Sequence, residues 1–473
     1  MAAFQNPPRL DIPNPGRHPA FRLLGGEKHM KKSNMKRFGA LVVGLSFVAV
    51  SCGSSDEAAT DTTVATEVAA GGELEGMKGT MPLVELSAEF KDGVNAYWTG
   101  AGNEALVDYS YTAEAFDAVN LIALAAEAAK TDGSALADSI ITVSRDGEKC
   151  TTFADCVALV KAGTDIDYDG ASGPNTMNGN GEPIEASYGV LTFDSTNRFD
   201  YANASYIPAS APESDYVDAQ KTTVTRKGDG QLKIGTLLPE TGNLAFLGAP
   251  EFAGVEYALS LINAAGGVLG KEVLYSQGDS GDNSTDTAST TVDRLLSENV
   301  DAIIGAASSG VSLKVIDKIT QAGVVQFSPA NTSDALSTYA DSALYFRNAP
   351  PDTLQGAVLA GLIAADGNAS VYILALDDAY GTGLAASIGK NLEAAGVSVL
   401  GTKIYDPAAV SFDAEVAEVV AANPDAIMLV TFDEGSRILR TMVEQGIGPK
   451  VKKVYGCDGN MGNALGENFD AGK

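Results

Sequence analysis

Polar side chains stand directly after strand-like apolar runs in the second half of the chain. The runs Ile303–Gly305, Val325–Ser328, Tyr372–Leu376, Met428–Thr431 and Val454–Gly456 are followed, in order, by Ser308 with Ser309, Ala330 with Thr332, Tyr380, Asp433 with Glu434, and Asp458. In open parallel sheets, ligands bind beyond the carboxyl ends of the strands. Hydroxyls and helix-start N–H groups suit a carboxylate, whereas an acidic group suits an ammonium. The set therefore predicts a cleft for a zwitterion, with neutral donors on one lobe and acids on the other.

Each of these residues also has a purely structural alternative. The alternatives are a helix cap for Ser309, a turn for Thr332, a solvated turn acid for Asp458 and a core or surface aromatic for Tyr380. Asp433 and Glu434 suit the N-terminus of a helix better than a ligand contact, because the helix dipole favours negative charge there.

Catalytic and metal chemistry find little support in the sequence. The chain has two histidines, His18 and His29, and both precede the export signal described below. After removal of that signal, the protein would contain no histidine, which excludes a Ser-His-Asp triad and most metal sites. Ala306–Gly310 partly resembles the Gly-x-Ser-x-Gly motif of a nucleophile elbow but lacks the first glycine of that motif. Asp165–Gly170 copies the start of a calcium loop, but position twelve of that loop is Thr176 instead of glutamate. We therefore expect a protein that is not an enzyme and that has no cofactor or metal.

Composition and charge narrow the class of protein. With 473 residues and 45% hydrophobic content, the chain can form two or three folded domains. Its formal net charge is −29. Such acidity argues against nucleic acid as a partner, because phosphate binding needs clustered Lys and Arg.

An export signal is predicted near the N-terminus. Lys31, Lys32, Lys36 and Arg37 precede the apolar run Phe38–Val50, which is too short to span a bilayer. Ser51-Cys52-Gly53 and a Ser/Thr/Asp/Glu/Ala-rich stretch follow. This pattern resembles a bacterial lipoprotein signal, in which the cysteine, here Cys52, is lipidated; the alternative is a short anchor or an ordinary cleaved signal. Export also permits a disulfide between Cys150 and Cys156, and leaves Cys457 unpaired and buried.

Strand and helix patterns alternate from Leu232 onward, which predicts α/β architecture with parallel sheets flanked by helices. The expected strands are Lys233–Leu238, Lys271–Ser276, Asp301–Gly305, Val324–Ser328, Val371–Leu376, Ser398–Tyr405, Ala426–Thr431 and Lys453–Gly456. The expected helices include Glu251–Ala264, Ser284–Glu298, Leu354–Ala364 and Gly383–Ala395. The similar rhythm before and after about Pro350 predicts two like lobes.

The part of the chain before Leu232 follows a different pattern. We expect strands at Leu74–Thr80 and Ser187–Phe193, and helices at Ser87–Thr99, Ser110–Ala129 and Phe153–Ala162. Residues 201–231 are polar with scattered proline and are predicted to be a linker.

Several motifs resemble the leucine/isoleucine/valine-binding family of periplasmic binding proteins. They are Lys233-Ile-Gly-Thr-Leu-Leu-Pro-Glu-Thr-Gly242, Asn263-Ala-Ala-Gly-Gly267, Ser328-Pro-Ala-Asn-Thr332, Asp378-Ala-Tyr-Gly-Thr-Gly383 and Tyr455-Gly-Cys-Asp-Gly459. The resemblance implies a type I binding-protein fold with a ligand between its lobes. It implies that Ser309 and Thr332 hold a carboxylate, and that the Ala330 carbonyl and Asp458 hold an ammonium. It also implies that Leu247 and Tyr380 line the side-chain space. Asp458 stands where the branched-chain proteins would have glutamate.

The order of the family's parts is unusual. Leu74-Glu-Gly-Met-Lys-Gly79, Tyr111–Ala129 and Tyr168-Asp-Gly-Ala-Ser-Gly-Pro174 resemble the family's C-terminal portion, yet they come first. A circular permutant, the remnant of a tandem pair and an assembly artefact all give this order. The expected organisation is a leader and signal over 1–51, a flexible linker over 52–73, a family C-terminal portion completing both lobes over 74–200, a linker over 201–231, and lobes over 232–349 and 350–473.

The resemblance implies an exported solute-binding lipoprotein of an ABC importer. The expected ligand is a small amino acid of branched-chain type or similar, the expected partner is an ABC permease, and a lipid would anchor the protein at the outer face of the cytoplasmic membrane or in the periplasm. The alternatives are a ligand-sensing domain acting with a membrane receptor, and a fragment or fusion that binds nothing.

Overall fold

The structure is a computed structural model that describes residues 72–199, 201–211 and 220–473, all within one compact unit. Cys52 and the predicted export signal lie outside the described residues. Among the described residues, no helix combines the length and the apolar character needed to cross a bilayer.

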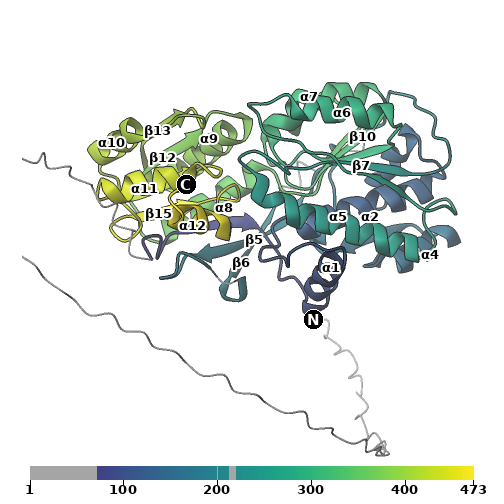
Figure 1. Cartoon of the computed structure of the whole chain (residues 1–473), viewed down its shortest axis with the longest axis horizontal. Coiled ribbons are helices and arrows are strands. Elements are labelled where there is room, and N and C mark those ends of the chain that lie inside the picture. The colour runs from purple at the N-terminus through teal and green to yellow at the C-terminus, as the bar shows by residue number, and fades with distance from the viewer. Residues whose placement is uncertain (1–71, 200, 212–219) are drawn as a thin grey trace, which may run out of the picture. The chain divides into compact units, whose positions relative to one another are not determined.

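The described chain forms two lobes, each built on one larger sheet (Figure 1). The first lobe contains a five-stranded, all-parallel sheet in the order β11 (Tyr345–Arg347), β10 (Val325–Ser328), β9 (Ala302–Gly305), β7 (Lys233–Leu237) and β8 (Leu274–Ser276). The second contains a seven-stranded sheet in the order β13 (Ser398–Tyr405), β12 (Ser370–Leu376), β14 (Ala426–Val430), β15 (Lys453–Gly456), β1 (Lys78–Pro82), β5 (Glu185–Thr192) and β6 (Ser205–Ser210). A small third sheet contains β2 (Glu148–Cys150), β3 (Ile166–Gly170) and β4 (Gly173–Pro174).

Helices flank both larger sheets. The first lobe carries α1 (Ala88–Gly100), α2 (Thr112–Ala129), α3 (Ala137–Ile140), α4 (Phe153–Ala162), α5 (Gly248–Ala264), α6 (Thr287–Ser297) and α7 (Ser309–Gln321). The second lobe carries α8 (Asp352–Ala365), α9 (Ala379–Ala394), α10 (Asp413–Ala422), α11 (Gly435–Glu444) and α12 (Asn463–Asp470). The predicted α/β architecture with two lobes is thus confirmed, and all eight strands expected after Leu232 are present.

Local signals explain where the helices begin and end. Asp378 caps α9 by accepting a hydrogen bond from the Gly381 N–H at 2.7 Å. Thr152 caps α4 by accepting one from the Asp155 N–H at 3.2 Å, and Gly163 ends that helix with a φ of 82°. Such caps satisfy N–H groups that have no partner inside the helix, and glycine adopts positive φ without a steric penalty.

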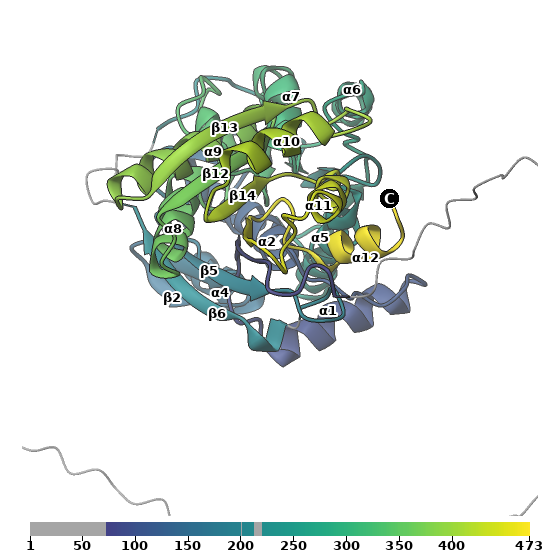
Figure 2. The ribbon, with the colours of Figure 1, turned by 90° about the vertical axis from the view of Figure 1, so that its left-hand side faces the viewer.

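The segment before Leu232 completes both lobes. Strand β1 pairs in parallel with β15, Lys78 opposite Tyr455, and antiparallel with β5. Figure 2 looks onto the second lobe, where β5 and β6 continue the sheet beside α8. Helix α2 packs against α5 of the first lobe. Residues 82 to 88, 174 to 185 and 347 to 352 carry the chain between the lobes, and a fourth crossing falls between β6 and β7.

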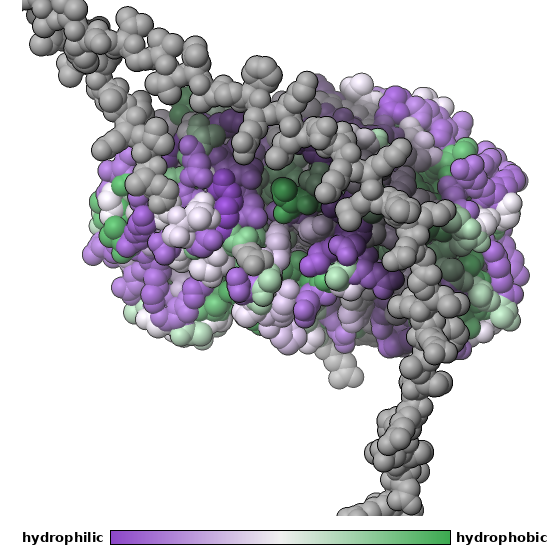
Figure 3. Space-filling model, turned by 60° about the horizontal axis from the view of Figure 1, so that its bottom comes forward, coloured by the Kyte–Doolittle hydropathy of each residue, from purple (hydrophilic) through white to green (hydrophobic). Residues whose placement is uncertain are grey.

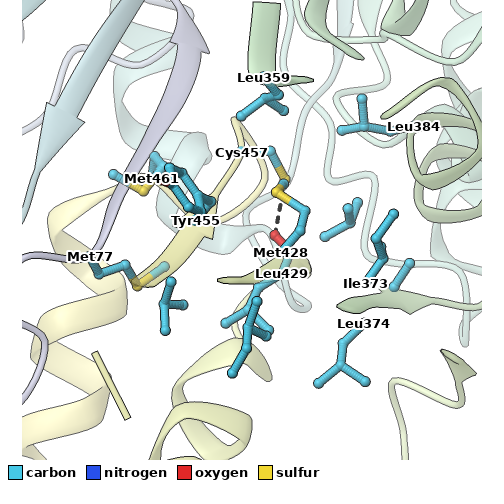
Figure 4. Packing of buried hydrophobic residues seen from close by; sticks show 14 of the residues in the cluster. Met77, Leu359, Ile373, Leu374, Leu384, Met428, Leu429, Tyr455, Cys457 and Met461 are labelled. Atoms are coloured by element: carbon cyan, nitrogen blue, oxygen red, sulfur yellow. Dashed lines mark hydrogen bonds between the residues drawn. The ribbon is translucent and has the colours of Figure 1, made fainter. Parts of the chain in front are cut away.

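The core of the second lobe joins residues from both parts of the chain. Met77 lies beside Tyr455 and Met461, and all three are buried (Figure 4). The Cys457 thiol lies within 3.5 Å of the Leu429 carbonyl oxygen in the same cluster. Cys457 is free and buried, as predicted. Fully burying a side chain of this size contributes about 1.5–3 kcal/mol, so contacts such as those of Met77 bind the early segment firmly to the later one.

Three sequence-based assignments need correction. Residues 205–210, assigned to the linker, form β6, because Tyr206 and Ile207 continue the pairing with β5. The first strand is Lys78–Pro82 instead of Leu74–Thr80, because a turn occupies the residues before it, where the Met77 N–H donates to the Leu74 carbonyl. Residues 166–170 form β3, and Asp167 and Asp169 pair with Lys149 at 2.9 and 2.7 Å.

The described surface is mixed in polarity. On the face shown in Figure 3, hydrophobic side chains are scattered among hydrophilic ones. The most exposed large hydrophobic residues are Val410 (96%), Val107 (76%) and Val451 (67%), which are far apart in sequence. Single exposed apolar residues are normal on folded proteins and carry no functional argument by themselves.

Candidate functional site

A small cavity lies where loops at the carboxyl ends of strands from both lobes meet. It encloses about 20 Å³, which is room for one or two water molecules. The lining residues are Tyr111, Leu244, Leu247, Ala307, Ser308, Ser309, Ala330, Thr332, Tyr380, Phe432, Asp458 and Gly459. All seven ligand-site residues predicted from the sequence are therefore brought together in one place.

The first lobe contributes hydroxyl groups at the start of α7. Ser308 is the N-cap of this helix, and its Oγ accepts a hydrogen bond from the Val311 N–H at 3.3 Å. Ser309 Oγ accepts from the Thr332 and Ser333 N–H groups at 3.3 and 3.2 Å. The cap is thus Ser308 and not Ser309. A hydroxyl accepts hydrogen bonds through its lone pairs and has one hydrogen to donate. The Ser308 and Ser309 hydroxyls can therefore still donate to an acceptor in the cavity.

The loop after β10 is held firmly behind these hydroxyls. Ser328 Oγ accepts hydrogen bonds from the Ala330 N–H at 3.2 Å and from the Asn331 N–H at 2.9 Å. The Thr332 carbonyl accepts from the Asp352 N–H at 2.7 Å. These bonds fix the loop that carries the Ala330 carbonyl and the Thr332 side chain.

A buried ion pair also stabilises the loop after β10. Arg347 is 1% exposed and donates to the Glu182 carboxylate at 2.5 Å and to the Ser333 carbonyl at 2.9 Å. The Arg347 guanidinium holds the pKa of the Glu182 carboxyl below its usual range despite burial, which opposes this shift. Glu182 lies on one of the segments between the lobes, so this pair connects that segment to the cavity wall.

The second lobe contributes one carboxylate, held by two tyrosines. Tyr380 donates to Asp458 Oδ1 at 2.8 Å and Tyr111 donates to Oδ2 at 2.9 Å. Asp458 is 6% exposed. Burial raises the pKa of its carboxyl, and the two tyrosine hydroxyls counteract part of this effect. Tyr380 also stacks on Phe432, with ring centroids 5.3 Å apart.

Tyr111 is the main site residue that the sequence did not indicate. It follows no strand, and it starts α2 with a φ of 57°, a left-handed conformation that is unusual for a bulky residue. Because α2 belongs to the first lobe and Asp458 to the second, their hydrogen bond connects the lobes. Leu244, Ala307, Phe432 and Gly459 were also missed; strand-end position alone does not reveal the direction in which such residues face.

Asp433 and Glu434 do not line the cavity. Glu434 precedes α11 and accepts hydrogen bonds from the Tyr405 hydroxyl at 2.8 Å and from the Phe432 N–H at 3.1 Å. Asp433 accepts from the Asn468 side chain at 3.2 Å. Their position at the start of a helix agrees with the structural alternative. In the part of the chain that the structure describes, no group of three or more His, Cys, Asp or Glu side chains is placed to hold a metal ion.

The two sulfur atoms of Cys150 and Cys156 are bonded in the structure. Their Cα atoms are 5.4 Å apart, because Cys150 ends β2 and Cys156 lies in the first turns of α4. The bond lies on the first lobe and outside the cavity lining.

Sequence comparison identifies the family. Residues 231–472, just over half of the chain, match the family described as periplasmic binding protein. The chain belongs to this family. Its curated relatives include Leu/Ile/Val-binding protein homolog 7 of Brucella abortus (strain 2308), which is 27% identical over 249 residues, covering 51% of this chain and 61% of that protein. Homolog 8 from the same strain is 28% identical over 227 residues, covering 46% and 56%. The chain thus spans about three-fifths of the length of these curated relatives.

Solved binding proteins resemble part of the chain. The leucine binding protein LivK from Thermotoga maritima is 24% identical, with a TM-score of 0.44, covering 48% of this chain and 63% of that one. The branched-chain amino acid transporter substrate binding protein LivJ from Streptococcus pneumoniae, in complex with isoleucine, is 25% identical, with a TM-score of 0.44, covering 50% and 67%. Both curated relatives are named as homologs of Leu/Ile/Val-binding proteins.

Proposed function

We propose that this periplasmic binding protein binds a small amino acid in the cavity between its lobes and delivers it to an ABC permease. The observation that carries the proposal is the polarity of the cavity. The hydroxyls of Ser308 and Ser309 face it from one lobe, and the Asp458 carboxylate faces it from the other. A carboxylate suits the first group and an ammonium suits the second.

Apolar groups complete the proposed ligand environment. Leu244, Leu247 and Phe432 line the cavity, which favours an aliphatic or small neutral side chain on the ligand. The names of the curated relatives, Leu/Ile/Val-binding protein homologs, support the same class of ligand. The cavity is smaller than an amino acid, so binding requires the lobes to move apart before they close on the ligand.

Titration calorimetry with a panel of amino acids tests the proposal. We expect heat from one or more aliphatic or small neutral amino acids. The matched controls for leucine are 4-methylpentanoate, which lacks the ammonium, and 3-methylbutylamine, which lacks the carboxylate; for another ligand, the corresponding pair is used. Each control should bind far more weakly, because one charged end has no partner. If no amino acid binds, or if a control binds as tightly as its parent, the proposed zwitterion site is wrong.

We also propose that the protein is exported and lipid-anchored through Cys52. The support is the sequence pattern alone: basic residues, a short apolar run and Ser51-Cys52-Gly53. Mass spectrometry of the membrane fraction should detect a diacylglyceryl group on an N-terminal Cys52. Recovery of unmodified Cys52 in soluble protein would contradict the anchor.

A further proposal concerns chain order: residues 74–200 correspond to the family's C-terminal portion in permuted position. Leu74 and Asp470 lie close together, because the Leu74 N–H donates to Asn197 Oδ1 at 2.9 Å and Asn197 Nδ2 donates to Asp470 at 2.6 Å. Strand β15 also pairs in parallel with β1. In the unpermuted order of this proposal, β1 would be the next strand of the chain after β15.

A reordered chain tests the permutation. The variant places residues 232–473 first and joins residue 473 directly to residue 74. If the order is permuted, this variant should fold, melt near the same temperature and bind the same ligand. A variant that fails to fold would contradict the proposed continuity.

A further inference from the structure

Helix α9 of the second lobe begins against the first lobe, outside the ligand cavity. It packs there against α7 and against the turn Asp334–Leu336 of the first lobe (Figure 1). Two hydrogen bonds cross between the lobes at this point. Asn283 Nδ2 of the first lobe donates to Asp378 Oδ2 at 3.3 Å, and Ser333 Oγ of the first lobe donates to the Ala379 carbonyl at 2.9 Å. None of these four residues lines the cavity.

Asn283 is held in place by α7. The Lys314 ammonium donates to the Asn283 carbonyl, and the Asn283 amide lies where Gly310 has no side chain. A Cβ atom added to Gly310 would come within 2.2 Å of Asn283 Nδ2, so this glycine makes the room that the amide needs. An ionised carboxylate can only accept hydrogen bonds, so the amide nitrogen of Asn283 is the atom that faces Asp378.

Both sides of this contact are connected to residues of the ligand site. On the first lobe, the Ser333 N–H donates to Ser309 Oγ at 3.2 Å. On the second lobe, Asp378 caps α9, and Tyr380 in the first turn of the same helix donates to Asp458 at 2.8 Å. The two hydrogen bonds between the lobes therefore join the elements that carry the serine hydroxyls to those that carry the carboxylate.

We propose that Asn283 and Ser333 form a latch with the start of α9, which holds the lobes closed and slows release of the ligand without touching it. This inference rests on the proposed function above. An amino acid can enter only when the lobes move apart, so bonds between the lobes beside the cavity break on opening and form again on closing. A contact that is made only in the closed form raises the affinity for every ligand by the same factor.

Exchanging two side chains tests the latch. Asn283→Asp places two carboxylates against each other and should speed ligand dissociation about tenfold, because a hydrogen bond to a charged group is lost. Asp378→Asn alone should change the rate little, since asparagine also caps helices and the Asn283 amide can turn its oxygen toward the new N–H. The double variant Asn283→Asp with Asp378→Asn again places an amide N–H opposite a carboxylate, so its dissociation rate should return close to that of the wild type.

Two further variants complete the kinetic experiment. Ser333→Ala removes the second contact and should speed dissociation about two- to tenfold. The control Asn203→Asp adds the same charge at an exposed position before β6 and should follow the wild type. Rates are measured by stopped flow at pH 8, because burial raises the pKa of Asp378 to about 6 and its carboxyl must be ionised. The two amino acids that bind most tightly in calorimetry serve as ligands.

A distance measurement tests the latch without any ligand. Spin labels are attached to Gln321→Cys on α7 and Glu393→Cys on α9, two exposed positions on different lobes. Pulsed electron resonance then gives the distribution of distances between the lobes. In the ligand-free protein, Asn283→Asp should increase the share of longer distances, and the double variant should reverse the change.

The outcomes separate the latch from the proposed function. The ratio of the dissociation constants for the two ligands should be the same in Asn283→Asp and the wild type, whereas a residue that contacts the ligand would change it. If Asn283→Asp leaves the dissociation rate unchanged, or if the double variant does not restore it, the latch is wrong and the amino-acid site stands. If the wild type binds no amino acid, the proposed function fails, and the distances decide about the latch: equal distributions for Asn283→Asp and the wild type would overturn it.

Discussion

Replacing Asp458 by asparagine should weaken ligand binding strongly while leaving the fold nearly intact. The Asp458 carboxylate is 6% exposed and accepts hydrogen bonds from Tyr380 and Tyr111. Asparagine is nearly isosteric and can accept from one tyrosine while donating to the other, so the network between the lobes survives. A bound ammonium, however, loses its counter-charge inside a closed cavity. Removing one partner of such a pair costs about 2–5 kcal/mol.

That free energy corresponds to a loss of affinity of about 30-fold to several thousand-fold, since about 1.4 kcal/mol changes a dissociation constant tenfold. Calorimetry and the ligand-induced shift in melting temperature measure this loss. Thr332→Ala should cost about 1.5–3 kcal/mol of binding, because one hydrogen bond to a charged group is lost. Asp433→Asn is the matched control, since Asp433 lies at the start of α11 and bonds Asn468. If Asp458→Asn binds as tightly as the wild type, the ammonium does not lie at Asp458 and the assigned polarity is wrong.

Three predictions concern the fold. Arg347→Met should lower the free energy of unfolding by about 3–5 kcal/mol in denaturant titrations, because it leaves Glu182 buried without its partner; an effect below about 1 kcal/mol would contradict this. Burial raises the pKa of Glu114 to about 8, so the folded state holds this proton longer than the unfolded state and loses stability as pH rises from about 4 to 8. The free energy of unfolding of Glu114→Gln should therefore rise relative to that of the wild type between pH 5 and 9. If the two free energies change with pH at the same slope, Glu114 does not have this effect. Alkylation without reductant should label neither Cys150 nor Cys156. Reducing the disulfide between them, which closes a short loop, should lower the free energy of unfolding by about 2 kcal/mol.

The sequence predicted the strands of the later segment well because parallel strands buried on both faces appear as continuous apolar runs. The runs that became β9, β12 and β14 are of this kind. Short edge strands such as β11 and β6 escaped, since a three-residue strand or one with proline has little local signal. Their pairing depends on partners that are remote in sequence.

The candidate site was predictable only where strand ends mark it. Ser309, Thr332 and Asp458 follow strands, and the sheet topology brings such positions together. Tyr111 lies at a helix start, and its place in the site arises from the packing of α2 against other elements. Neither a motif nor a spacing shows that the Tyr111 side chain approaches Asp458.

A crystal structure of the protein with the amino acid selected by calorimetry would show directly whether the cavity holds a zwitterion in the proposed orientation. We expect the ligand in the cavity between the lobes, with its ammonium against Asp458 and the Ala330 carbonyl. Its carboxylate should lie against the hydroxyls of Ser309 and Thr332. A ligand bound in the reverse orientation, or bound outside this cavity, would show that the proposed site is wrong.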